Sequence, residues 1–262
     1  MDILETIVAN KKLEVRSKKL EVGISDLEMS DLFQRKTLSL REFLLDKNKT
    51  GIIAEYKRKS PSKGIINDLS TVEDVTKAYA ESASGISVLT DENFFGGNTN
   101  DLLKARINQI PILRKDFMID EYQIIEAKSI GADVILLIAA CLSPNQVKQF
   151  ASLAKQLGLE VLLEIHNYQE LEHICADVDF IGVNNRNLKT FEVDIQTSLN
   201  LINKIPTEML AIAESGISNV DTIVTLRDAG FSGFLIGENF MKETNPMIAF
   251  ADFVAQLKTK LV

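Results

Sequence analysis

The stretch GIIAEYKRKS, residues 51–60, begins as a short apolar run and ends in charged and polar side chains. An open, doubly wound sheet that binds a dinucleotide would carry a glycine-rich turn after its first strand. Residues 55–60 hold EYKRKS at that place instead. A closed (β/α)8 barrel gathers polar residues at the carboxyl ends of its strands, where its active site lies. The stretch therefore favours the barrel and argues against a dinucleotide site.

Eight short apolar runs, of which this is the first, alternate with longer amphipathic segments along the chain. Such alternation is typical of parallel strands joined by crossover helices, and a helical pattern follows each strand. Eight units favour a closed (β/α)8, or TIM, barrel because closure leaves no strand edge exposed. The predicted strands are residues 51–57, 85–90, 112–115, 134–139, 160–165, 180–184, 210–214 and 234–237. Examples of the predicted helices are residues 71–84, 120–130, 144–157 and 220–229.

The segment before the first predicted strand also shows helical patterning. Apolar residues recur at helical spacing between residues 3 and 15, and again between residues 33 and 44. The segment contains no linker or low-complexity tract that would mark a separate domain. We therefore expect residues 1–49 to form an N-terminal helical extension packed on the barrel, and residues 1–262 to form a single domain.

The composition is that of an ordinary globular protein, with 45% hydrophobic residues, 25% charged residues and a net charge of −8. This acidic balance argues against nucleic-acid and anionic-membrane partners. No apolar run approaches the roughly 20 residues of a membrane span, and the amino terminus lacks a signal-peptide core, so we expect a cytoplasmic protein. The two cysteines, Cys141 and Cys175, predict buried free thiols. We expect a monomer or a weak homodimer.

Polar side chains interrupt the apolar pattern at the carboxyl ends of several predicted strands. A lysine and a glutamate that converge in one pocket can donate and remove protons. The alternatives are a structural ion pair at the first strand and a solvated end at the third. The interrupting residues are Glu55, Lys57, Lys115, Glu164, Asn184, Arg186, Glu214 and Ser215.

Small residues follow the last two predicted strands, at Ser215, Gly216 and Gly237. They let backbone N–H groups at helix amino termini approach an anion, and the loops after strands seven and eight form the recurrent phosphate site of this fold. We therefore expect a phosphate-bearing small-molecule substrate. A metal site is not expected, because His166 and His173 have no further ligand at suitable spacing. Both are expected to be surface or loop histidines.

Taken together, the motifs resemble the indole-3-glycerol-phosphate synthase family. The resemblance covers essentially the whole chain. It implies conversion of 1-(2-carboxyphenylamino)-1-deoxyribulose 5-phosphate into indole-3-glycerol phosphate, carbon dioxide and water, with no cofactor and no metal. The motifs are IAEYKRKSPSKG (residues 53–64), LTD (89–91), FFGG (94–97), LRKDF (113–117), LLIAA (136–140), GVNNRNL (182–188) and AESGI (213–217).

The resemblance also implies a role for each matched catalytic residue. Lys115 would be the principal general acid, which protonates the ketone oxygen while the ring carbon that bears the carboxylate attacks. Glu164 would be the general base of the dehydration. Lys57 would hold the anthranilate carboxylate and share in proton transfer, while Glu55 and Asn184 would orient these groups and the sugar hydroxyls.

The remaining matched residues would bind the substrate. Arg186 would add positive charge near the reacting carboxylate, and Glu214 belongs with it to the substrate-binding set. Phe95 and Phe117 would flank the anthranilate ring, although without the family core packing is the better explanation for both. The phosphate site would be lined by Ser60, Ser215, Gly216 and Gly237.

Two positions depart from the commonest family pattern, since Glu238 and Asn98 stand where serine is frequent. On the premise that its side chain points outward, Glu238 is left out of the predicted site. Two other functions stay open. One is another phosphate-binding barrel such as phosphoribosylanthranilate isomerase, whose expected cysteine near the first strand is missing here. The other is a catalytically silent binding barrel, against which the joint presence of the polar strand-end residues argues.

Overall fold

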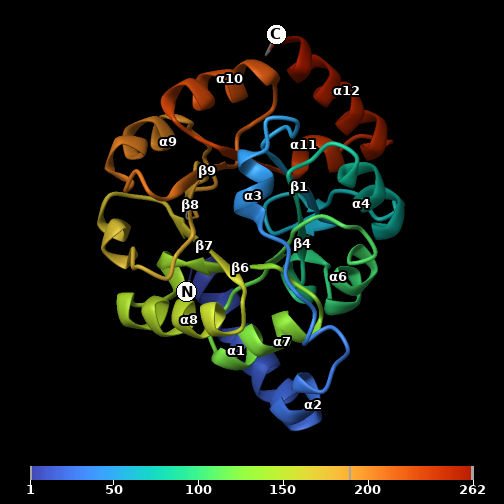
Figure 1. Ribbon diagram of the computed structural model, residues 1–262, viewed down its shortest axis with the longest axis vertical. Coiled ribbons are helices and arrows are strands. Elements are labelled where there is room, and N and C mark those ends of the chain that lie inside the picture. Colours follow the sequence, from blue (N-terminus) through green and yellow to red (C-terminus); the bar gives the residue numbers. More distant parts are fainter. Residues whose placement is uncertain (1, 189, 261–262) are drawn as a thin grey trace.

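The computed structural model describes residues 2–188 and 190–260. Within them, eight parallel strands close into a barrel in the order β1-β10-β9-β8-β7-β6-β5-β4, surrounded by helices (Figure 1). The predicted (β/α)8 barrel is confirmed, and every strand lies within one residue of its predicted bounds. The strands are β1 Ile52–Tyr56, β4 Gly85–Leu89, β5 Ile112–Lys115, β6 Val134–Ile138, β7 Glu160–Ile165, β8 Phe180–Asn184, β9 Leu210–Glu214 and β10 Gly233–Ile236.

Helices cover the outer surface, between successive barrel strands and after the last strand. They are α4 Val72–Ala80, α6 Thr99–Ala105, α7 Glu121–Ser129, α8 Pro144–Gln156, α9 Gln196–Leu201, α10 Val220–Ala229 and α12 Pro246–Lys260. The predicted helix at residues 220–229 has the bounds of α10, and the other three named predictions are longer than the helices observed.

Shorter elements lie in the connections between strands and helices. A helix was predicted after every strand, but between β7 and β8 the chain forms only a 3-10 turn. The short elements are the hairpin strands β2 Lys59–Ser60 and β3 Gly64–Ile65, the helices α5 Glu92–Phe95 and α11 Glu238–Met241, and the 3-10 turns η1 Ala139–Cys141, η2 Gln169–His173 and η3 Ile202–Lys204.

The end of the barrel at which the strands begin is filled by apolar side chains. α3, Leu40–Leu45, lies across this end in the centre of Figure 1, and Leu40 and Leu44 pack against interior residues of the strands. The approach is close, since a Cβ on Gly85 would lie 2.8 Å from Cδ1 of Leu40. The helix begins where Ser39 accepts a hydrogen bond from the backbone N–H of Glu42. Polar chemistry is thereby restricted to the opposite end.

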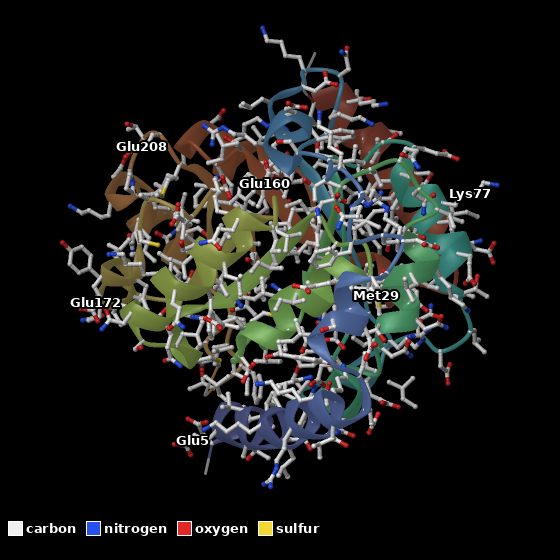
Figure 2. All side chains as sticks on the ribbon, turned by 60° about the horizontal axis from the view of Figure 1, so that its bottom comes forward. Glu5, Met29, Lys77, Glu160, Glu172 and Glu208 are labelled. Carbon is white, nitrogen blue, oxygen red and sulfur yellow. The ribbon has the colours of Figure 1, made fainter. Side chains whose placement is uncertain are left out.

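The N-terminal extension contains α1, Ile3–Glu21, and α2, Ile24–Glu28, before α3. α1 lies against α7 in Figure 1, and Figure 2 shows Glu5 at one end of α1, at the edge of the molecule. The second helix predicted in this segment, between residues 33 and 44, is wrong in extent. The helix found there, α3, begins only at Leu40 and ends at Leu45. The preceding loop is held by side-chain contacts instead, such as the hydrogen bond from Ser39 Oγ to Glu160 Oε1 at 2.6 Å.

Within residues 2–188 and 190–260, no helix has the length and apolar character that crossing a membrane requires. Cys141 and Cys175 are free thiols, as predicted, but both are half-buried rather than buried.

Candidate active site

The polar strand-end residues meet at the carboxyl end of the barrel, around a cavity of about 160 Å³. They come from the ends of six strands, β1, β4, β5, β7, β8 and β9, or from the loops that follow them, so residues far apart in sequence become neighbours. The structure brings together all the predicted site residues except Gly216 and Gly237 in the lining of this cavity. The lining residues among those predicted are Glu55, Lys57, Ser60, Phe95, Lys115, Phe117, Glu164, Asn184, Arg186, Glu214 and Ser215.

The two glycines line an adjoining cavity of about 570 Å³, which shares Glu55, Lys57 and Arg186 with the first. Gly237 has no room for a side chain, because a Cβ there would lie 2.6 Å from Oε1 of Glu55. The backbone at this place is therefore left uncovered, as an anion site requires. The predicted helix termini are present only in part: α11 begins directly after Gly237, whereas a loop separates Gly216 from α10.

Lys115, at the end of β5, lies between two carboxylates. Its Nζ is 3.1 Å from Oε2 of Glu164 and 2.5 Å from Oε2 of Glu214. Burial alone would lower the pKa of Lys115, but the charges of Glu214 and Glu164 raise it well above its usual range. Burial and the charge of Glu164 outweigh the attraction of Lys115 for Glu214, and raise the pKa of Glu214 to about 7. At neutral pH the ammonium carries its proton, and Glu214 is poised between its two forms.

Glu164 has three polar neighbours that fix its side chain. Asn184 Nδ2 donates to its Oε1 at 3.1 Å, and Nε2 of His166 lies 3.3 Å from the same oxygen. Although burial would raise the pKa of Glu164, the charges of Lys115 and His166 hold it well below its usual range. The residue is therefore an ionised carboxylate in the empty site.

His166 is a site residue that the sequence analysis missed. It lies in a loop, as expected, but its side chain is only 11% exposed, so a surface position is wrong. The ring lies between Glu164 and Glu170, with Nδ1 3.3 Å from Oε2 of Glu170, and these two carboxylates raise its pKa to about 10 against the effect of burial. His173 is also buried, with Nε2 2.9 Å from the carbonyl oxygen of Leu142. The described residues contain no group of three or more His, Cys, Asp or Glu side chains that could hold a metal ion.

A second ion pair lies at the end of β1, which is separated from β5 by β4 alone. Nζ of Lys57 is 2.8 Å from Oε1 of Glu55, and both side chains line the two cavities. Their position two residues apart at the end of β1 places them on one side of the chain, as predicted. Lys57 is 16% exposed at its side chain, so it faces the open space while paired.

Two phenylalanine rings form one wall of the cavity. Phe95 ends α5 and Phe117 follows β5, and their ring centroids are 5.9 Å apart with an angle of 38° between the planes. Both rings line the cavity, and Phe117 also packs against the apolar residues of the barrel interior. The separation and angle fit aromatic contact with each other and leave apolar faces toward the cavity.

The premise about Glu238 is wrong, because its side chain points into the site. Oε2 lies 3.5 Å from Nη2 of Arg186, Oε1 lies 4.0 Å from Nζ of Lys63, and the residue lines both cavities. Its carboxylate is drawn inward by these two cations, which come from loops distant in sequence. Asn98, the other departure, caps α6 through a hydrogen bond from the backbone N–H of Asp101.

This arrangement can donate protons to, and remove protons from, a bound aromatic and anionic ligand. The ammonium groups of Lys57 and Lys115 pair with three carboxylates at the mouth, and one wall is aromatic. Polar groups held in this way are suited to general acid and general base catalysis. Fold and site together define a (β/α)8-barrel enzyme whose chemistry is proton transfer.

Comparison with known proteins narrows this class to one family. The family model described as "Indole-3-glycerol phosphate synthase" matches residues 4–253. A relative of that name from Bacteroides thetaiotaomicron is 45% identical over 259 residues, covering 98% of this chain and 99% of the relative. Another, from Verminephrobacter eiseniae, is 41% identical over 266 residues, covering 97% and 99%. The chain belongs to the indole-3-glycerol phosphate synthase family, which confirms the family and the enzymatic function predicted from the sequence.

Solved structures with the same architecture are more distant in sequence. A chain of the tryptophan synthase a2b2 complex from Pyrococcus furiosus has a TM-score of 0.62 and 16% identity, covering 80% of this chain and 99% of that chain. Orotidine 5'-monophosphate decarboxylase from Sulfolobus solfataricus has a TM-score of 0.60 and 14% identity, covering 82% and 100%. At these identities the likeness shows the fold alone.

Proposed function

We propose that this enzyme converts 1-(2-carboxyphenylamino)-1-deoxyribulose 5-phosphate into indole-3-glycerol phosphate, carbon dioxide and water at the mouth of the barrel. The observation that carries the proposal is the position of Lys115, whose ammonium lies between Glu164 and Glu214 in a cavity walled by aromatic rings. The family places this reaction in tryptophan biosynthesis.

The first step is ring closure. The substrate ketone oxygen binds next to Nζ of Lys115, and the ring carbon that bears the carboxylate attacks the ketone carbon. As the new carbon–carbon bond forms, Lys115 gives its proton to the oxygen. The raised pKa of Lys115 in the empty site keeps this proton in place until a substrate oxygen is present to take it.

The two later steps restore aromaticity. The bond to the carboxylate breaks, its electrons return to the ring, and carbon dioxide leaves. Glu164 then removes a proton from the carbon next to the ring nitrogen, while the hydroxyl formed in the first step takes a second proton from a lysine and leaves as water. Two protons are donated and one is removed, so each turnover takes one proton from solvent.

Binding groups surround this reaction centre. Lys57 and Arg186 hold the anthranilate carboxylate until it leaves, with Lys57 fixed by its contact with Glu55. Asn184 orients Glu164 through their hydrogen bond at 3.1 Å. The phosphate lies in the adjoining cavity, against the small residues that follow β9 and β10, with Ser60 at its border.

Turnover of the carboxyphenylamino substrate by purified protein tests the proposal. Fluorescence of the indole product is followed with no added metal and with a chelator present. Appearance of the indole chromophore supports the proposal. Absence of product from folded protein would overturn it and return attention to the isomerase and silent-barrel alternatives.

We also propose a cytoplasmic enzyme that folds as one domain and is a monomer or a weak homodimer. Two free cysteines suit a reducing compartment, and side chains of residues 35–39 bind the barrel through Asp133, Gly158 and Glu160. One cooperative unfolding transition and a monomer–dimer mass in sedimentation are the expected results. Two separate transitions or a larger assembly would contradict this description.

A further inference from the structure

A lysine of the N-terminal extension is buried beside the site without being part of it. The side chain of Lys11, on α1, has 0% exposure. Its Nζ lies 3.0 Å from Oδ2 of Asp91, 2.9 Å from Oδ1 of Asp116 and 2.7 Å from Oε2 of Glu14. A buried ammonium is stable only with such partners. Because Lys11 has no exposed surface, it cannot contact a substrate.

The first partner, Asp91, holds the backbone of one cavity wall. Its Oδ1 accepts hydrogen bonds from the backbone N–H groups of Phe94 at 2.8 Å and Phe95 at 3.3 Å. Asp91 thereby caps α5, the helix that carries the Phe95 ring. The other carboxylate oxygen faces Lys11, so the ammonium determines where this cap lies.

The second partner, Asp116, holds the backbone of the facing ring. Its Oδ1 accepts from the backbone N–H of Phe117 at 2.8 Å and also lies next to Lys11. Its Oδ2 accepts from Oγ1 of Thr90 at 2.6 Å and from Nη2 of Arg114 at 3.1 Å. Asp116 is therefore fixed on every side, directly after Lys115.

We propose that Lys11 is a positioning residue that sets the distance between the Phe95 and Phe117 rings by joining Asp91 to Asp116. The inference rests on the proposed function, in which these rings flank the anthranilate ring of the substrate. It assigns a part of substrate recognition to the extension, through one ammonium that binds a carboxylate on each of the two loops.

Removal of the ammonium changes the balance of charge between the two loops. Asp91 and Asp116 both have 0% exposed side chains, so without Lys11 two carboxylates face each other with no access to water. Burial tends to raise the pKa of Asp116, and Lys11 and Arg114 together hold it well below its usual range. Asp116 keeps Arg114, whereas Asp91 loses its cation, so the loop that carries Phe95 moves.

Ligands with and without an aromatic ring distinguish positioning from general structural support. In Lys11→Met, the Kd of indole-3-glycerol phosphate is expected to rise about three- to tenfold, the size of an aromatic contact. The Kd of glycerol 3-phosphate, which has no ring, is expected to stay unchanged, because the phosphate cavity lies on the side of β9 and β10. Lys12→Met, an exposed neighbour on α1, is the matched control and changes neither value.

Two further variants keep the test decisive. If Lys11→Met does not fold, Asp91→Asn retains the oxygen that caps α5 and weakens only the ion pair, and the same ring-selective change is expected. Equal weakening of both ligands, or no change in either, would overturn the inference. Phe95→Ala tests the underlying function. If this variant leaves the Kd of indole-3-glycerol phosphate unchanged, the proposed ring site is wrong. If Phe95→Ala raises that Kd and the Lys11 variant does not, only the positioning role of Lys11 is wrong.

Discussion

Two buried ion clusters meet at consecutive residues of the chain, one around Lys115 and one around Asp116. Lys115 lies between two carboxylates, Glu164 and Glu214. Lys11 lies among three, those of Asp91, Asp116 and Glu14. Both clusters reach the lining of the cavity, the first through Lys115 and the second through Asp116. The side chain of Lys115 is 14% exposed there, whereas those of Lys11, Asp91 and Asp116 have 0% exposure. Access to open space, rather than burial or ion pairing, separates a reactive cluster from one that holds the scaffold.

Lys115→Met should produce the largest effect, because it removes the principal proton donor. The turnover number is expected to fall by roughly 10²- to 10⁴-fold. Stability should fall much less, since Glu214, with a pKa of about 7, can take up a proton when its cation is lost. Steady-state kinetics and urea unfolding measure the two quantities. Near-normal turnover in this variant, together with an inactive Lys57→Met, would assign the principal acid to Lys57.

Asp116→Asn should lower stability more than turnover, the reverse of Lys115→Met. The variant leaves Lys11 and Arg114 with less negative charge in a fully buried place, and the free energy of unfolding is expected to fall by about 3–5 kcal/mol. The turnover number of the folded fraction should fall less than in Lys115→Met. Asp68→Asn, at an exposed position, is the control in urea unfolding. A loss of turnover as large as that of Lys115→Met, without a loss of stability, would erase the distinction between the clusters.

His166→Asn should show an intermediate, pH-dependent effect. The folded state raises the pKa of His166 from 6.5 to about 10, so its protonated ring adds stability below pH 6.5 that is lost as the pH rises through about 10. The wild type is therefore expected to exceed the variant by roughly 1–3 kcal/mol at low pH, and the gap should close toward pH 10. Urea unfolding at several pH values measures it. A gap that is constant with pH would show that the contacts with Glu164 and Glu170 do not depend on charge.

Glu238→Gln should have the smallest effect. Its carboxylate lies beside Arg186 and Lys63 in the lining of the proposed phosphate cavity, where it repels an anion and occupies its cations. Neutralisation is expected to lower the Kd of inorganic phosphate by about two- to fivefold, measured as competitive inhibition. Weaker phosphate binding would instead mean that Glu238 is needed to hold Arg186 in place.

The strands could be predicted closely because parallel barrel strands are buried on both faces. β6, for example, is a continuous apolar run, and all of its residues are buried. Polar residues that end such runs, like Lys115 and Glu164, were visible for the same reason. Their convergence in one cavity follows from barrel closure, which brings all strand ends together.

Features that depend on partners from distant loops could not be predicted in this way. The inward direction of Glu238 follows from Arg186 and Lys63, which the local sequence around Glu238 does not reveal. Lys11 did leave a signal, because it stands four residues from both Ile7 and Val15, and all three are buried on one face of α1. A lysine in the apolar stripe of a helix indicates a buried counter-charge elsewhere.

Barrel closure also determines the order in which the fold can be completed. β1 pairs with β4 on one side and with β10 on the other, where Ile52 lies opposite Phe234. A chain that emerges from the ribosome in sequence order has made nearly all of its barrel before the second partner of β1 exists. Such distant pairing slows folding and leaves one edge of β1 unpaired and prone to aggregation during synthesis. The last barrel strand to be translated is the one that pairs with this edge.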